Sequence, residues 1–264
     1  MPMTPILVFD IETIPDLAGL RRTHDIPASL SDDAVLAWYA QRRRAQTGGD
    51  FVPLHFQRVV AIACALRDEA GFKIGSVGTL DDPEPVLIRR FFDLIDKHTP
   101  QLVSWNGGAF DLPVLNYRAL VHGVTASRFW DWGDDDREFR YNGYLNRFHT
   151  RHLDLMDVLA MYQPRAGAGL AAMARLCGFP GKLGMDGGAV HGAVRAGKLD
   201  EVRRYCETDV LNTHLLYQRF RLLRGEIEAA EYAGEISLAR ERIAAIPAPH
   251  WAEFIAAWDA NVTR

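Results

Sequence analysis

Residues 5–15 read P-I-L-V-F-D-I-E-T-I-P, and this stretch decides the fold. Its apolar run, residues 6–9, is typical of a strand that is buried on both faces. Because side chains alternate along a strand, Asp10 and Glu12 should emerge on the same side. Two buried carboxylates repel each other unless a cation lies between them, and their oxygen atoms suit Mg²⁺ or Mn²⁺. The alternative is a strand that ends by Asp10 and leaves two solvated acids in a loop.

The composition is that of a globular protein with a full core, because 48% of the 264 residues are hydrophobic and 24% are charged. The net charge of −4 gives no global basic field, which counts mildly against a nucleic-acid substrate. Three cysteines without metal-ligand spacing indicate reduced thiols. No targeting segment precedes the first strand, and the longest later apolar run, residues 59–66, is too short to cross a bilayer. We therefore expect a soluble, cytoplasmic protein with no membrane partner.

Further strands and helices follow from the spacing of apolar residues. Strands are expected at residues 58–67, 72–80, 101–105 and 152–155. Helices are expected at about residues 81–99, 111–122, 155–161, 170–177, 187–196 and 199–223, with two more in the C-terminal tail. Glu69-Ala70-Gly71 is a short connection that predicts a hairpin between the second and third strands.

Two long segments interrupt this pattern. Residues 16–57 form an excursion between strands, in which Ser31-Asp32-Asp33 can cap a helix that runs to Arg44 and is broken by residues 47–50. Residues 127–150 are rich in aromatic and charged side chains, and Asn142-Gly143 inside them is a two-residue turn signal that predicts a β-hairpin or flap.

The expected fold class is α/β: a mixed β-sheet flanked by helices, with a β-hairpin insertion and a helical C-terminal extension. We expect one compact domain over residues 1–224, with residues 225–264 packed on it as the helical extension. No repeat or low-complexity linker divides the chain.

Three further polar residues accompany the first pair of acids. Asp111 lies at an expected helix start just beyond a strand end, where α/β proteins present catalytic groups. Tyr205 and Asp209 are four residues apart and therefore share one face of a helix. Each feature alone is ordinary, as an N-cap aspartate or a surface pair. Their conjunction with Asp10 and Glu12 predicts a common site.

The three segments together resemble a known set of motifs. D-I-E-T (10–13), N-G-G-A-F-D-L-P (106–113) and Y-C-E-T-D (205–209) are similar to the three motifs of the DEDD 3′–5′ exonucleases. The tyrosine four residues before the last aspartate matches the DEDDy branch. The second motif resembles that of the proofreading exonuclease domain of family-B DNA polymerases, and the chain resembles free-standing bacterial exonucleases related to that domain. The resemblance spans residues 4–223 and implies a ribonuclease H-like fold.

This resemblance implies a metal-dependent 3′–5′ exonuclease that hydrolyses single-stranded nucleic acid, with DNA favoured, to nucleoside 5′-monophosphates. Two divalent cations, Mg²⁺ or Mn²⁺, would be held by four carboxylates. By this resemblance Asp10 bridges both ions, Glu12 and Asp209 complete the first site, and Asp111 supports the second. Tyr205 would orient the attacking water.

The resemblance also implies residues that grip the substrate. Thr13, Asn106 and Phe110 match positions that hold the 3′-terminal nucleotides. Phe110 would stack on a base, although a place in the core is nearly as plausible for it. Asp154 and Lys182 are weaker candidates for steadying the site or a phosphate.

Two other functions compete with this one. Asp-Ile-Glu-Thr also resembles the start of haloacid dehalogenase-type phosphatases, but their second acid is an aspartate, and the acidic run 134–136 precedes Lys182 where that family places it afterwards. A catalytically silent nucleic-acid-binding or scaffold protein is the other alternative. Intact carboxylates argue against it, because buried acids without a metal would reduce stability.

Overall fold

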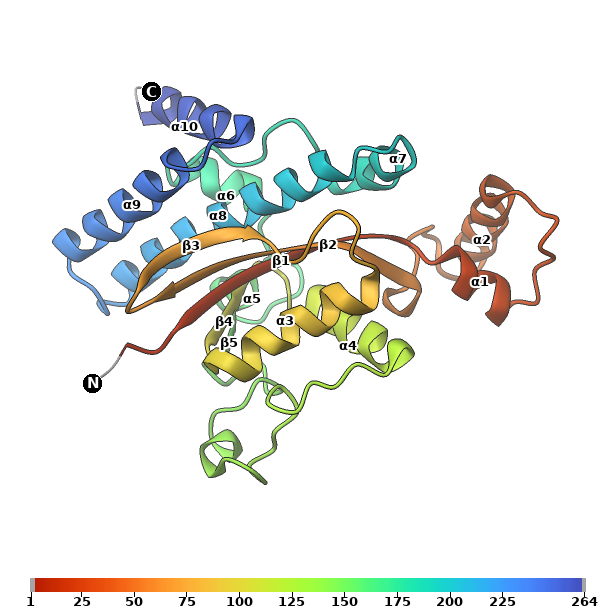
Figure 1. The fold of residues 1–264 in the computed structure, drawn as a ribbon, viewed down its shortest axis with the longest axis horizontal. Helices are drawn as coiled ribbons and strands as arrows, with labels where there is room; N and C mark the ends of the chain where they lie inside the picture. The colour runs from red at the N-terminus through yellow and green to blue at the C-terminus, as the bar shows by residue number, and fades with distance from the viewer. Residues whose placement is uncertain (1–2, 263–264) are drawn as a thin grey trace.

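A computed structural model describes residues 3–262, and within them five strands form one mixed sheet in the order β3-β2-β1-β4-β5 (Figure 1). The strands are β1 (Ile6–Pro15), β2 (Gln57–Asp68), β3 (Gly71–Ser76), β4 (Gln101–Ser104) and β5 (His152–Asp154). The first three strands pair in antiparallel fashion, whereas β4 lies parallel to β1 and β5 parallel to β4. The carboxyl ends of β1, β4 and β5 therefore meet at one edge of the sheet. The mixed sheet confirms the predicted α/β fold class.

Helices cover both faces of this sheet. They are α1 (Leu17–Thr23), α2 (Asp32–Thr47), α3 (Glu84–His98), α4 (Asp111–His122), α5 (Leu155–Leu159), α6 (Leu170–Leu176), α7 (Val190–Arg195), α8 (Leu199–Leu223), α9 (Ala229–Ala244) and α10 (Pro249–Val262), with short 3₁₀ turns η1 (Leu54–Phe56), η2 (Arg137–Arg140) and η3 (Gly187–Ala189). In Figure 1, α3 and α4 lie on one side of the sheet and α6, α8, α9 and α10 on the other.

Strand β1 lies at the centre and continues to Pro15, so the alternative in which it ends by Asp10 is wrong. Its side chains alternate between two cores. Val8 packs in the core beneath α8, and Phe9 packs in the core beneath α3 and α4. Asp10 and Glu12 follow Val8 in this alternation, and both acids lie close to Asp209 of α8. The run of apolar residues thus fixes which helix the two acids meet.

The helices begin and end where their caps place them. The Ser31 side chain accepts a hydrogen bond from the Ala34 N–H at 3.2 Å, and α2 ends at Gly48, which has a positive φ of 78°. The predicted bounds of α4 and α8 agree with the structure. The third strand is shorter than predicted: the Val77 N–H still donates to the Ile62 carbonyl at 2.7 Å, and the chain then turns away from the sheet at Gly78, with φ 71°.

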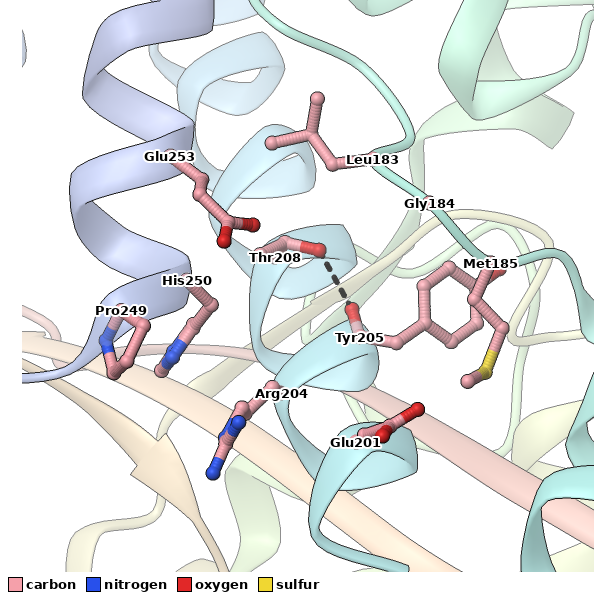
Figure 2. A pocket seen from close by; sticks show the side chains of 10 residues that line it. All are labelled: Leu183, Gly184, Met185, Glu201, Arg204, Tyr205, Thr208, Pro249, His250 and Glu253. Carbon is pink, nitrogen blue, oxygen red and sulfur yellow. Dashed lines mark hydrogen bonds between the residues drawn. The ribbon is translucent and has the colours of Figure 1, made fainter. Parts of the chain in front are cut away.

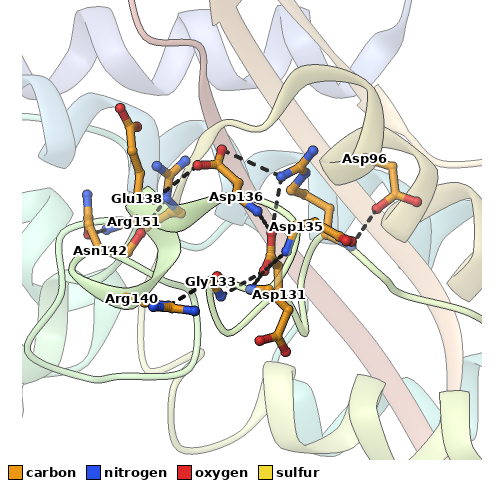
Figure 3. A network of polar contacts seen from close by, with 11 residues as sticks. Asp96, Asp131, Gly133, Asp135, Asp136, Glu138, Arg140, Asn142 and Arg151 are labelled. Carbon is orange, nitrogen blue, oxygen red and sulfur yellow. Dashed lines mark hydrogen bonds and ion pairs between the residues drawn. The ribbon is translucent and has the colours of Figure 1, made fainter.

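The predicted β-hairpin over residues 127–150 is wrong, because the segment contains turns and η2 but no strand. Its backbone donors are satisfied in another way: the Asp131 carboxylate accepts hydrogen bonds from the N–H groups of residues 133–136 at 2.8–3.4 Å (Figure 3). Asn142, half of the turn signal, instead accepts from the Arg151 N–H at 2.9 Å. A buried aspartate therefore organises this segment as a compact loop.

The C-terminal helices share the larger core with the sheet. Trp251, Phe254 and Trp258 of α10 belong to the same buried cluster as Val8. Helix α9 is also joined to the sheet by an ion pair between Arg67 and Glu235 at 2.7 Å. The two predicted tail helices are therefore present and packed against α8 and the sheet.

The excursion between β1 and β2 has a small core of its own. Leu20, Val35, Tyr39 and Phe56 are buried together, and α1 and α2 extend from the body of the molecule beyond the end of β1 (Figure 1). This pair of helices therefore lies next to the edge of the sheet at which the acids meet.

Candidate active site

The first motif presents its acids where β1 is irregular. The pairing of β1 with β2 shifts register between Glu12 and Thr13, immediately after the second acid. Such irregularities re-aim side chains and are frequent beside functional sites. The ligand atoms of Asp10, Glu12 and Cys206 all lie within 4.8 Å of one another. The strand thus brings both carboxylates to one point against α8.

The second motif is joined directly to the first. Asp111 is the first residue of α4, and its Oδ1 accepts a hydrogen bond from the Ile11 N–H at 3.0 Å. Ile11 separates Asp10 from Glu12, so this bond holds the third carboxylate next to the first two. Asp111 is only 4% exposed.

The turn before α4 depends on close backbone packing. A Cβ on Gly107 would lie 2.4 Å from the Ser104 side chain, so only glycine fits there. Asn106 adopts a positive φ of 67°, and its N–H donates to Asp154 at 2.8 Å. The other Asp154 oxygen accepts from the Gly108 N–H at 2.9 Å. Asp154 therefore shapes the second motif from β5.

The third motif lies on α8, which carries Tyr205 and Asp209 on one face as predicted. Lys182, on the loop before α7, lies 3.7 Å from Asp209 Oδ2 and also donates a hydrogen bond to the Tyr205 hydroxyl. Asp209 Oδ1 is buried and has no hydrogen-bond partner among the described residues. An acceptor of this kind is costly to bury unless a cation or a water binds it.

The four carboxylates disfavour one another's charge. Burial raises the pKa of Asp111 to about 7 and that of Asp209 to about 6. Burial and repulsion from the neighbouring acids raise the pKa of Asp10 and Glu12 well above their usual values. A divalent cation would remove this repulsion, and the donor set, rich in carboxylate oxygens with one orphaned acceptor, fits such an ion.

The Tyr205 hydroxyl stays protonated and can donate a hydrogen bond. Burial and the acids around it raise the pKa of its hydroxyl far above the ordinary value of a phenol, so the group stays protonated. One edge of the ring borders a cavity of about 330 Å³ between α8 and α10, lined also by Met185, Arg204 and His250 (Figure 2). The tyrosine thus lies between the acids and an open space.

The predicted substrate-binding residues lie around the same acids. The Thr13 hydroxyl donates to Gln57 Oε1 at 3.0 Å. Phe110 directly precedes Asp111 and is half-buried, with its ring packed partly against the core beneath α4 and partly against Phe51, at 6.3 Å between ring centroids. Thr13 follows Glu12 on β1 and Phe110 precedes Asp111 at the start of α4, so each is a sequence neighbour of a carboxylate of the site.

Sequence reasoning assigned no role in the site to Cys206. Its thiol donates to the Asp10 carbonyl at 3.3 Å and contacts Asp10 Oδ2 at 3.5 Å. A helical signal for it was available, because Cys206 precedes Asp209 by three residues and therefore shares its face. Gln57 and Phe51 carry no such local signal.

The comparisons with known proteins agree with this geometry. A family model described as a predicted 3′–5′ exonuclease related to the exonuclease domain of PolB matches residues 49–258. The chain belongs to this exonuclease family. The matched residues include Asp111 and Asp209, whereas Asp10 and Glu12 lie before the match begins. The protein is therefore an enzyme of the 3′–5′ exonuclease class.

Solved structures are also similar to this exonuclease, and one of them is a DNA polymerase. It is the family B DNA polymerase from the hyperthermophilic archaeon Pyrobaculum calidifontis, with 18% sequence identity and a TM-score of 0.49 over 83% of this chain and 24% of that one. The exonuclease thus corresponds to about a quarter of the length of that polymerase.

Among residues 3–262, no helix is long and apolar enough to cross a membrane.

Proposed function

We propose that this exonuclease removes nucleotides from the 3′-end of single-stranded nucleic acid and releases nucleoside 5′-monophosphates. One observation carries the proposal: four carboxylates from β1, α4 and α8 converge, and within residues 3–262 no hydrogen-bond partner reaches the buried Oδ1 of Asp209. DNA is the favoured substrate because the family is related to a polymerase exonuclease domain.

Asp10, Glu12, Asp111 and Asp209 would hold two divalent cations, Mg²⁺ or Mn²⁺. Such ions lower the pKa of bound water and stabilise the leaving oxygen of a phosphodiester. Water adds to phosphorus, the bond from phosphorus to the 3′-oxygen breaks, and the products are a nucleoside 5′-monophosphate and a strand with a new 3′-hydroxyl.

The other residues position the reacting groups. Tyr205 remains protonated, so it can orient the attacking water by a hydrogen bond but does not remove its proton. Lys182 donates to the Tyr205 oxygen, which directs the hydroxyl proton away from the lysine. Asp154 holds the turn that presents Asp111, through its hydrogen bonds to the backbone at Asn106 and Gly108.

The test uses single strands of DNA and RNA labelled separately at each end, incubated with Mg²⁺ or Mn²⁺. Label at the 3′-end should appear first as a mononucleotide, whereas 5′-label should remain on progressively shorter strands. EDTA should stop the reaction, and a circular single strand should stay intact. Cleavage of the circle, or release of 5′-label as the first product, would overturn the proposal.

A further inference from the structure

Phe51 is a large apolar side chain left in solvent beside the candidate active site. It lies between α2 and η1, and 59% of its surface is exposed. Its ring packs on Phe110, with 6.3 Å between centroids and a tilt of 59°. Phe110 directly precedes Asp111, so this aromatic pair adjoins the backbone that carries the third acid.

The backbone beside Phe51 is tied to the catalytic strand. Gln57 is buried, and its Nε2 donates to the Val52 carbonyl at 2.8 Å. The same side chain accepts from the Thr13 hydroxyl at 3.0 Å, and Thr13 follows Glu12 on β1. A path of two hydrogen bonds therefore fixes the position of Phe51 relative to the acids.

The excursion between β1 and β2 also helps to hold Phe51, through its neighbour Val52. The Val52 side chain packs against the small core that α1 and α2 form with Phe56. The exposed ring of Phe51 leaves water only when a partner covers it, and this burial of apolar surface is favourable. Because Phe51 packs on Phe110, which precedes Asp111, such a partner would lie next to the reacting end of the substrate. A nucleobase fits, because every base offers an apolar face and stacking on an aromatic ring does not depend on sequence.

We propose that Phe51 and Phe110 together form the stacking surface for the 3′-terminal base, and that the α1–α2 excursion serves to hold Phe51 in place. This inference rests on the proposed function and gives the excursion a role in it. The sugar-phosphate backbone of the terminal nucleotide then lies over the carboxylates, while its base lies over the two rings.

The experiment uses a single strand of DNA with 2-aminopurine at its 3′-end, whose fluorescence is quenched when the base stacks. Binding is measured with Ca²⁺, after gel analysis has established that the strand stays intact. Phe51→Ala should abolish most of the quenching and weaken binding by about 5- to 100-fold, the range of one lost stacking contact. Phe51→Trp should restore both, and Phe51→Leu should not.

Trp132→Ala is the matched control, because Trp132 is 65% exposed and lies in the loop that Asp131 organises. It should behave like the wild type. A 2-aminopurine placed five nucleotides from the 3′-end should respond equally in wild type and Phe51→Ala.

The outcomes separate this inference from the proposed function. Suppose that the wild type hydrolyses single strands. If Phe51→Ala then quenches the 2-aminopurine fluorescence and binds the strand as the wild type does, the stacking surface is refuted while the exonuclease stands. Full binding by Phe51→Leu would refute it in the same way. If the wild type neither binds nor hydrolyses any strand with Mg²⁺ or Mn²⁺, the proposed function itself fails.

Discussion

The Ile11 N–H donates to Asp111 Oδ1 at 3.0 Å, which joins two motifs that are 100 residues apart in the sequence. The bond is buried, and its donor is the N–H group of the residue that separates Asp10 from Glu12. Asp111 therefore has two separable properties: an oxygen that satisfies a backbone donor of β1, and a negative charge that would help to bind a cation.

Substitutions at Asp111 should separate these two properties. Asp111→Asn keeps an oxygen for the Ile11 N–H, so it should fold at least as stably as the wild type yet lose most nuclease activity. Asp111→Ala leaves that donor unpaired, so its free energy of unfolding should be about 1–3 kcal/mol lower than that of Asp111→Asn. Thermal unfolding and an end-labelled cleavage assay measure the two effects. Full activity in Asp111→Asn would show that its charge is not needed.

Cation binding should be visible without any substrate. In EDTA, Asp10→Asn should raise the midpoint of thermal unfolding, by about 2–4 °C for each kcal/mol of repulsion that it removes. Mn²⁺ should stabilise the wild type, because a ligand that binds only the folded state shifts the equilibrium towards it. The variant should respond much less. Equal stabilisation of both proteins by Mn²⁺ would place the cation elsewhere.

The raised pKa of Asp111 makes stability depend on pH. Its value moves from 3.8 to about 7 on folding, so between these values the folded protein holds a proton that the unfolded chain has released. Without metal, this group therefore destabilises the protein progressively as pH rises from about 4 to about 7. His152 and His214, whose pKa burial lowers to about 4, contribute the opposite trend.

The difference between two proteins isolates the acid from the histidines. Asp111→Asn cannot titrate, so its free energy of unfolding in EDTA should exceed that of the wild type by more at pH 8 than at pH 5. Chemical denaturation at both pH values provides the measurement. A constant difference would mean that Asp111 has an ordinary pKa.

The acids were predictable because their placement is local. Alternation along β1 puts Asp10 and Glu12 on one side, and a spacing of four residues puts Tyr205 and Asp209 on one face of α8. The fold class followed from the order of apolar runs. Phe51 was not predictable, because its contact with Phe110 depends on how the excursion folds back over the end of β1.

The hairpin prediction shows how a tertiary contact overrides a local signal. Asn142-Gly143 is typical of a tight turn between strands, but strands need free backbone donors and acceptors on either side. In this segment the Asp131 carboxylate instead binds four backbone donors, over residues 133–136, and the Tyr141 and Asn142 N–H groups donate to the Glu138 carbonyl. The spacing of the residues in the sequence does not predict that a single buried aspartate will bind these backbone groups.

Tyr205→Phe should retain measurable activity. The phenol stays protonated at neutral pH, so its contribution is to orient water rather than to accept a proton. Single-turnover cleavage of a labelled strand compares this variant with Asp209→Asn, which should lose far more. If the two variants were equally inactive, the hydroxyl would take a direct part in proton transfer.

Lys182 should set the pH at which the site becomes ionised. Its ammonium group lies 3.7 Å from Asp209 Oδ2, and its charge lowers the pKa of both Asp209 and Glu12 against the effect of burial. Lys182→Gln should therefore move the acid limb of the kcat/KM profile to higher pH, with activity at pH 6 falling severalfold relative to pH 8. Lys182→Arg, which keeps the charge, should restore most of the profile.

Lys198→Gln is the control, since this lysine pairs with Glu201 at 3.0 Å on the surface of α8. An equal loss of activity at every pH in Lys182→Gln would instead indicate that the lysine acts through Tyr205 or the substrate.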